Sequence, residues 1–295
     1  MDRTDKLDKT SAQSARPENN IDRAQQRQVE EQVKLIQEAG QREKLKELDE
    51  ALKPEDNLTG KDLEKRLKIL IANMAPEDIN RAATYGHDLG RGMVLVRTIP
   101  QGVTVFGSAR VREGEKYYEK ARELGGLLAQ NGHAVVTGGG PGIMEAANRG
   151  AYEFGGRSVG LNITLEHEQF ANRYLTDTLE FEYFFARKVT LTMASKVFVY
   201  FPGGFGTLDE FSEILCLMQE NKMPRLPMFL YGKSYWRGLD KFFKNRFLKE
   251  KMINAKDTHI YKITDDLEEI VRAANKMGHP RVGESLYDII GHHKL

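Results

Sequence analysis

Short apolar runs alternate with amphipathic helical patterns from Gly102 onward, and this alternation limits the fold more than any other feature. The runs are continuous and rich in Val, Ile and Phe, so they predict strands that are buried on both faces. The expected strands are 103–106, 134–137, 158–163, 178–183, 197–201, 227–231 and 260–263. The main expected helices are 115–130, 143–154, 186–194, 208–220 and 267–277. Right-handed connections then give an α/β, Rossmann-like, doubly wound parallel sheet with helices on both faces, over residues 100–295.

The residues before this region have a different composition. Residues 1–28 are polar and charged and contain almost no large apolar side chains, so we predict that they are disordered. Residues 29–99 combine sparse apolar stripes with many Gln, Glu and Lys, which predicts an N-terminal helical extension. Such an extension can dock on its own core, on a second subunit or on another protein.

Charge and cysteine content exclude several classes of protein. Lys and Arg number 44 against 43 Asp and Glu, so a formal charge of +1 gives no general attraction to nucleic acid or to membranes. No apolar run approaches the roughly 20 residues that span a bilayer, and the first residues lack the apolar core of a secretory signal. We therefore expect a cytoplasmic protein. The single cysteine, Cys216, excludes an internal disulfide, and its place on an apolar helix face predicts a buried structural thiol.

The segment Pro202–Glu210 carries the most specific chemical signal. It reads Pro-Gly-Gly-Phe-Gly-Thr-Leu-Asp-Glu and joins an apolar strand to a helix. Glycines at the start of a helix leave free backbone N–H groups that, with the helix dipole, bind an anion such as phosphate. A carboxylate, Glu210, is expected in the first helical turn. An acid beside a phosphate site indicates chemistry on the neighbouring sugar rather than on the phosphate.

Two other strand ends carry candidate binding residues. Gly138–Gly142 is a glycine-rich turn whose N–H groups can form an anion-binding nest. It has neither the Gly-Lys-Ser/Thr of a Walker loop nor the usual dinucleotide spacing, which disfavours a nicotinamide cofactor. The other strand end is Gly107-Ser108, where the serine offers a hydroxyl, although this segment taken alone favours an ordinary strand-to-helix turn.

A basic pair, Arg187-Lys188, opens the helix that precedes the Pro202 strand. Adjacent helical residues project about 100° apart, so one side chain can enter a site while the other faces solvent or a neighbour. A basic pair on a helix is usually a solvated face, but the position of this helix favours a functional role.

Three motifs resemble the signatures of the LOG ("Lonely Guy") family of cytokinin riboside 5′-monophosphate phosphoribohydrolases, often mislabelled as lysine decarboxylases. They are 138–148 (Gly-Gly-Gly-Pro-Gly-Ile-Met-Glu-Ala-Ala-Asn), Arg187-Lys188 and Pro202–Glu210, and the resemblance covers roughly residues 100 to 275. It implies that Arg187 and Glu210 form the catalytic pair. The residues that it implies for substrate and phosphate binding are Ser108, Gly138, Gly139, Gly140, Met144, Gly203, Gly204, Gly206 and Thr207. The chain departs from plant-type members after Ser108, where Ala109-Arg110 replaces a second serine and a glycine.

The function that this resemblance implies is hydrolysis of the N-glycosidic bond of a purine or cytokinin nucleoside 5′-monophosphate, giving free base and ribose 5-phosphate. It also implies a homodimer or dimer-based oligomer. We expect no metal and no cofactor, because the seven histidines are scattered and no ligand cluster is visible. The alternatives are a non-catalytic nucleotide-binding or cofactor carrier protein of the same fold, and a nucleic-acid-binding protein, which the neutral charge disfavours.

Overall fold

The computed structural model describes residues 68–99, 102–164 and 171–277, with isolated helical positions at 31, 34, 42, 43, 46 and 65. The predicted disordered segment 1–28 lies outside the described residues, as does most of the helical pattern before residue 68. Contacts divide the chain into one unit, Met1–Ile79, and a second unit, Asn80–Leu295. In the first unit, residues 68–72 are helical.

A seven-stranded, wholly parallel sheet forms the centre of the second unit, with the strand order β4-β3-β2-β1-β5-β6-β7. The strands are β1 Gly102–Phe106, β2 Ala134–Thr137, β3 Ser158–Ile163, β4 Asp177–Phe181, β5 Ser195–Tyr200, β6 Met228–Tyr231 and β7 Lys262–Thr264. The α/β fold predicted from the sequence is confirmed, because every expected strand is present and all neighbouring strands in the sheet are parallel.

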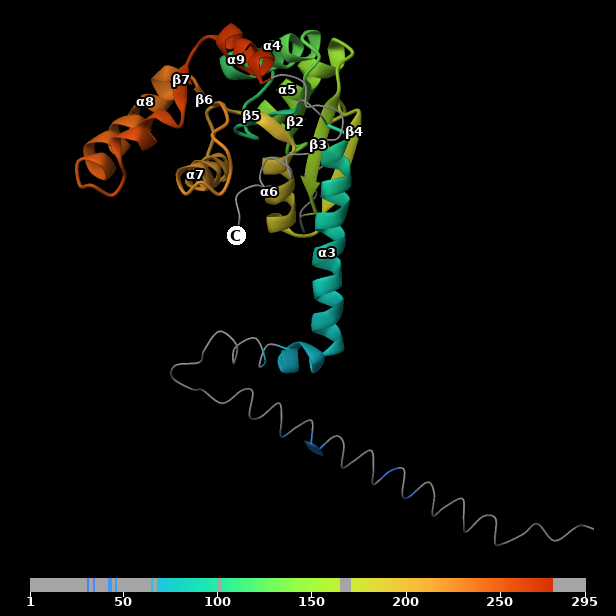
Figure 1. The fold of residues 1–295 in the computed structure, drawn as a ribbon. Coiled ribbons are helices and arrows are strands. Elements are labelled where there is room, and N and C mark those ends of the chain that lie inside the picture. The colour runs from blue at the N-terminus through green and yellow to red at the C-terminus, as the bar shows by residue number, and fades with distance from the viewer. Residues whose placement is uncertain are drawn as a thin grey trace, which may run out of the picture. The chain divides into compact units, whose positions relative to one another are not determined.

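Helices cover both faces of this sheet (Figure 1). One face is covered by α4 Lys116–Gln130, α5 Ile143–Glu153 and α9 Leu267–Lys276. The other is covered by part of α3 Pro76–Arg97 and by α6 Phe184–Met193, α7 Phe205–Gln219 and α8 Lys233–Phe242. A π-helical segment, Phe243–Leu248, and a 3₁₀ turn, Ala255–His259, follow α8.

Successive residues of the central strands point into two separate cores. In β5, Val197 and Val199 contact the α4, α5 and α9 side, while Phe198 and Tyr200 contact the α6 and α7 side. All four side chains are at most 1 % exposed. This two-sided burial explains why the strands read as continuous apolar runs rather than as alternating patterns.

From Asn80 onward, α3 packs with the sheet unit. A Cβ on Gly92 would lie 2.2 Å from Oγ1 of Thr190, so the glycine allows α3 and α6 to approach closely. Asp88 is 3 % exposed, and its Oδ2 accepts hydrogen bonds from the N–H groups of Glu182 (2.8 Å) and Tyr183 (3.2 Å). Asp88 therefore fixes the start of α6, the helix that carries Arg187.

The structure corrects two local expectations. Helix α7 begins at Phe205 rather than at Leu208, so Glu210 lies in its second turn and not its first. Cys216 is exposed and not buried, because the apolar residues of α7 exceed what one face can bury and the fold turns Cys216 outward. Among the residues that the structure describes, no helix is long and apolar enough to cross a bilayer.

Candidate active site

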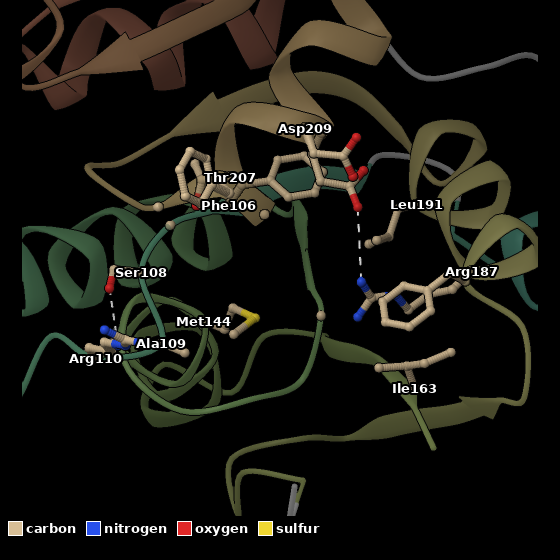
Figure 2. Close-up of a pocket in the computed structure, with 17 residues that line it drawn as sticks. Phe106, Ser108, Ala109, Arg110, Met144, Ile163, Arg187, Leu191, Thr207 and Asp209 are labelled. Atoms are coloured by element: carbon tan, nitrogen blue, oxygen red, sulfur yellow. Dashed lines mark hydrogen bonds and ion pairs between the residues drawn. The ribbon is translucent and has the colours of Figure 1, made fainter. Parts of the chain in front are cut away.

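A cavity of about 640 Å³ lies where β1, β2 and β5 end at their carboxyl edge (Figure 2). In the sheet β1 lies between the other two: the strands that follow β1 along the chain are added on the β2 side up to β4, and from β5 on they are added on the opposite side. Such a switch point is where open α/β sheets bind ligands. The predicted residues that line the cavity are Ser108, Gly138, Met144, Arg187, Gly204, Gly206, Thr207 and Glu210. The predicted residues that do not line it are Gly139, Gly140 and Gly203.

The N-terminus of α7 forms one wall of this cavity. Gly204 is the N-cap, and the first intrahelical hydrogen bond runs from the N–H of Leu208 to the Gly204 carbonyl oxygen (3.1 Å). The amides of residues 205–207 therefore precede the hydrogen-bonded ladder of the helix. Free amides and the positive end of the helix dipole make this wall suited to an anion.

Gly203 acts through packing rather than as part of the wall. A Cβ there would lie 2.1 Å from Oγ1 of Thr207 and 3.0 Å from the backbone nitrogen of Ser108. The Ser108 N–H donates a 3.0 Å hydrogen bond to the carbonyl oxygen of Pro202. Only glycine lets the loops after β1 and β5 approach this closely.

The Gly138–Gly140 turn is held from behind by an asparagine. The side-chain amide of Asn172 donates to the carbonyl oxygens of Gly139 (3.1 Å) and Gly140 (3.2 Å). Gly139 has φ +72°, a left-handed conformation that favours glycine. Gly139 and Gly140 are buried and do not line the cavity, whereas Gly138 and Met144 do.

Arg187 and Glu210 both line the cavity and form an ion pair. In Figure 2 a dashed line runs from the guanidinium of Arg187 to a carboxylate oxygen. The Arg187 Nη2 atom lies 3.9 Å from the Glu210 Oε1 atom, and the two side chains are 17 % and 7 % exposed. Within the described part of the chain, Glu210 Oε2 and Arg187 Nε are buried without hydrogen-bond partners. Buried polar atoms are normally satisfied, so these two are positioned to bond a ligand or water.

Burial shifts the pKa of both members of this pair. It raises the pKa of the Glu210 carboxyl from 4.5 to about 7, although Lys188 and Arg187 act in the opposite direction. Burial also lowers the pKa of Arg187, which the Glu210 carboxylate opposes. Arginine nevertheless stays charged in proteins. The cavity thus holds a fixed cation beside an acid that exchanges its proton near neutral pH.

Lys188 is directed to different partners. Its Nζ atom lies 2.7 Å from Oδ2 of Asp209 and 2.8 Å from Oε2 of Glu213. Of the basic pair, Arg187 therefore lines the cavity, while Lys188 neutralises the acidic face of α7. The Arg187 guanidinium also lies 5.3 Å from the centre of the Phe184 ring, which helps to orient it.

Several wall residues were not among the predicted site residues. They are Phe106, Gly107, Ala109, Arg110, Ile163, Phe184, Phe205, Leu191 and Asp209. The apolar ones sit at strand ends or on helix faces, where the sequence pattern matches ordinary core residues. Together they provide an apolar surface suited to a flat base. In the part of the chain that the structure describes, no three His, Cys, Asp or Glu side chains gather as a metal site.

Several known proteins are similar to this chain in sequence. The family model described as "Possible lysine decarboxylase" matches residues 144–274. A "Probable cytokinin riboside 5'-monophosphate phosphoribohydrolase LOGL6" of Oryza sativa is 24% identical over 67% of this chain and 80% of that protein. An uncharacterised protein of Archaeoglobus fulgidus is 32% identical over 37% of this chain and 68% of its own length.

Two further matches are a relative of which this chain covers less than half and a solved structure. A "Pyrimidine/purine nucleotide 5'-monophosphate nucleosidase" of Escherichia coli K12 is 28% identical over 60% of this chain but only 40% of that protein. A solved molybdenum cofactor carrier protein of Chlamydomonas reinhardtii is 24% identical with a TM-score of 0.44, covering 59% of this chain and 96% of that one. By its sequence relatives and its family model, this chain belongs to the LOG family, whose model carries the lysine decarboxylase description.

Proposed function

We propose that this protein hydrolyses the N-glycosidic bond of a purine nucleoside 5′-monophosphate, releasing the free base and ribose 5-phosphate. The observation that carries the proposal is the buried Glu210, which faces Arg187 at 3.9 Å in a cavity whose wall includes the N-terminus of α7. The phosphate lies against the amides of residues 205–207, which places the ribose beside the acid. The names of the rice and Escherichia coli relatives agree with this reaction class.

The chemistry follows from charge development on the sugar. As the bond between the anomeric carbon and the base nitrogen breaks, its electron pair leaves with the base and positive charge builds on the ribose. The Glu210 carboxylate stabilises that charge and accepts a proton from the attacking water, whose oxygen bonds to the anomeric carbon. The leaving base takes up one proton from solvent, and Glu210 returns to solvent the proton that it accepted, so the atoms of one water are divided between the two products.

Arg187 has a positioning role beside Glu210. Its guanidinium holds oxygen atoms of the substrate and keeps part of the Glu210 population ionised, because a neighbouring cation favours the carboxylate. Phosphate binding supplies the energy that holds the sugar in the reactive position, so a nucleoside without phosphate reacts poorly.

The test is release of free base from AMP, GMP, CMP and N6-substituted AMP by the purified protein, followed by chromatography. We expect Glu210→Gln to lower the rate at least about 100-fold, as loss of an acid–base group does, while circular dichroism is unchanged. The matched control is Glu213→Gln, one turn along α7 and outside the cavity wall, which keeps its activity. Nucleotide binding without base release by the wild type would instead support a carrier or sensor protein.

A further inference from the structure

Arg110 lies in the loop between β1 and α4 and lines the cavity. Its backbone N–H donates a 3.1 Å hydrogen bond to Oγ of Ser108, which fixes the turn (Figure 2). The Arg110 guanidinium makes no hydrogen bond or ion pair with any residue that the structure describes. A cation on the wall of a cavity is thus left without a counter-charge.

The other charged wall residues each have an opposite charge beside them. Arg187 lies 3.9 Å from Glu210, and Asp209 forms a 2.7 Å ion pair with Lys188. Arg187 and Asp209 therefore each have an ionisable partner within the protein. Arg110 is the remaining charge on the described wall, and it has the sign that attracts an anion.

The Arg110 loop is tied to both glycine turns of the site. The carbonyl oxygen of Ser108 accepts a 3.0 Å hydrogen bond from the N–H of Ile143, in the first turn of α5. The N–H of Ser108 donates to Pro202 at 3.0 Å, just before the start of α7. Two helix N-termini therefore meet beside this loop, and both favour negative charge. An anion seated there is within the region that Arg110 lines.

We propose that Arg110 is a specificity-determining residue that pairs with the 5′-phosphate of the substrate and selects phosphorylated over unphosphorylated nucleosides. The backbone amides of α7 supply hydrogen bonds, and Arg110 supplies the full positive charge that the turn lacks. Ser108 is the positioning residue that holds the Arg110 backbone in place. The identity of the phosphate-bearing substrate rests on the proposed function, whereas phosphate binding by Arg110 does not.

Binding of ribose 5-phosphate, measured by titration calorimetry against ribose, tests the proposal directly. Since hydrogen bonds to charged groups are strong, Arg110→Ala should weaken ribose 5-phosphate binding about 10-fold to 100-fold. Arg110→Lys should recover part of the affinity, because lysine keeps the charge but loses the planar fork. The matched control is Arg112→Ala, which removes a nearby arginine that does not line the cavity.

Activity gives the second readout. We expect Arg110→Ala to raise the KM for AMP while the kcat/KM for adenosine stays unchanged. Unaltered ribose 5-phosphate affinity in Arg110→Ala, or an equal loss in Arg112→Ala, overturns the proposal. If the wild type releases no base from any nucleotide, the proposed hydrolysis fails, and the calorimetry still decides whether Arg110 binds phosphate.

Discussion

The hydroxyl of Tyr235, on α8, donates a 2.6 Å hydrogen bond to the carbonyl oxygen of Gly203, in the turn before α7. A trans peptide group points its C=O and N–H in opposite directions, so this bond directs the N–H of Gly204 away from Tyr235. Gly204 lines the cavity, whereas Tyr235 does not. A residue outside the cavity thereby fixes an amide of the anion-binding turn.

Tyr235→Phe tests this relationship. Losing one hydrogen bond of about 1 kcal/mol should raise the KM for a nucleoside monophosphate about 5-fold and leave kcat near its wild-type value. Steady-state kinetics with AMP gives both constants. Tyr117→Phe is the control, because its hydroxyl contacts Ser234 and not the turn. A fall in kcat with constant KM would show that Tyr235 acts elsewhere.

The pH dependence of catalysis should report Glu210. Because burial raises its pKa to about 7 and the reaction uses the carboxylate, kcat/KM should rise with pH and level off above that value. Lys188→Met should move the midpoint upward, since the Lys188 charge lowers the pKa of Glu210. A pH profile of kcat/KM for wild type and variant measures both effects. A wild-type midpoint near the ordinary 4.5 contradicts this prediction.

Glu210 should also make the protein less stable at pH 7 and above than at pH 4.5. Its pKa is higher in the folded state than the ordinary 4.5, so the folded chain binds more protons between pH 4.5 and about 7. The free energy of unfolding should then fall as the pH rises through this range, by up to about 3 kcal/mol. Glu210→Gln mimics the protonated form, so it should match the wild type below pH 4.5 and be more stable above pH 7. Urea unfolding across this range checks it, and parallel curves for the two proteins would refute it.

Two glycines with similar φ angles allow backbone strain to be measured apart from side-chain contact. Gly139 has φ +72° and Gly155 has φ +68°, but only at Gly139 would a Cβ meet another atom, Oδ1 of Asn162 at 2.1 Å. Gly155→Ala should cost about 1 kcal/mol from the left-handed backbone alone. Gly139→Ala should cost about 1–3 kcal/mol more, because a buried contact is overfilled. Urea denaturation of both variants measures the difference, and equal losses would mean that Asn162 moves aside freely.

The homodimer or dimer-based oligomer expected from the sequence stays a prediction. Helix α6 exposes Phe185 (44 %) and Val189 (39 %), so we expect its outer face to be covered by a second copy. Light scattering during gel filtration should give twice the mass of one chain, and Val189→Glu should give the monomer. Tyr152→Glu, which changes an exposed aromatic residue on α5, is the control. A wild-type mass equal to that of one chain would contradict this prediction.

Local patterns in the sequence were sufficient to predict the fold class. A strand such as 197–201 is recognisable because a continuous β-branched and aromatic run can be buried on both faces only in a covered parallel sheet. The glycine-rich turns were visible for a similar reason, since glycine clusters at strand ends mark tight turns and close backbone approach. Both signals depend only on residues that are close together in the chain, so they can be recognised in a single sequence.

Contacts between distant segments decided the rest. Helix geometry allowed either member of Arg187-Lys188 to enter the site, and only the family resemblance pointed to Arg187. In the structure the two side chains separate because α7 places Glu210 beside Arg187 and Asp209 beside Lys188. The exposure of Cys216 depends on which face of α7 meets the sheet. Residue type and spacing thus determined the layered sheet and its glycine turns, whereas the side-chain directions and the raised pKa of Glu210 came from tertiary packing, because burial and charge pairing exist only once remote segments meet.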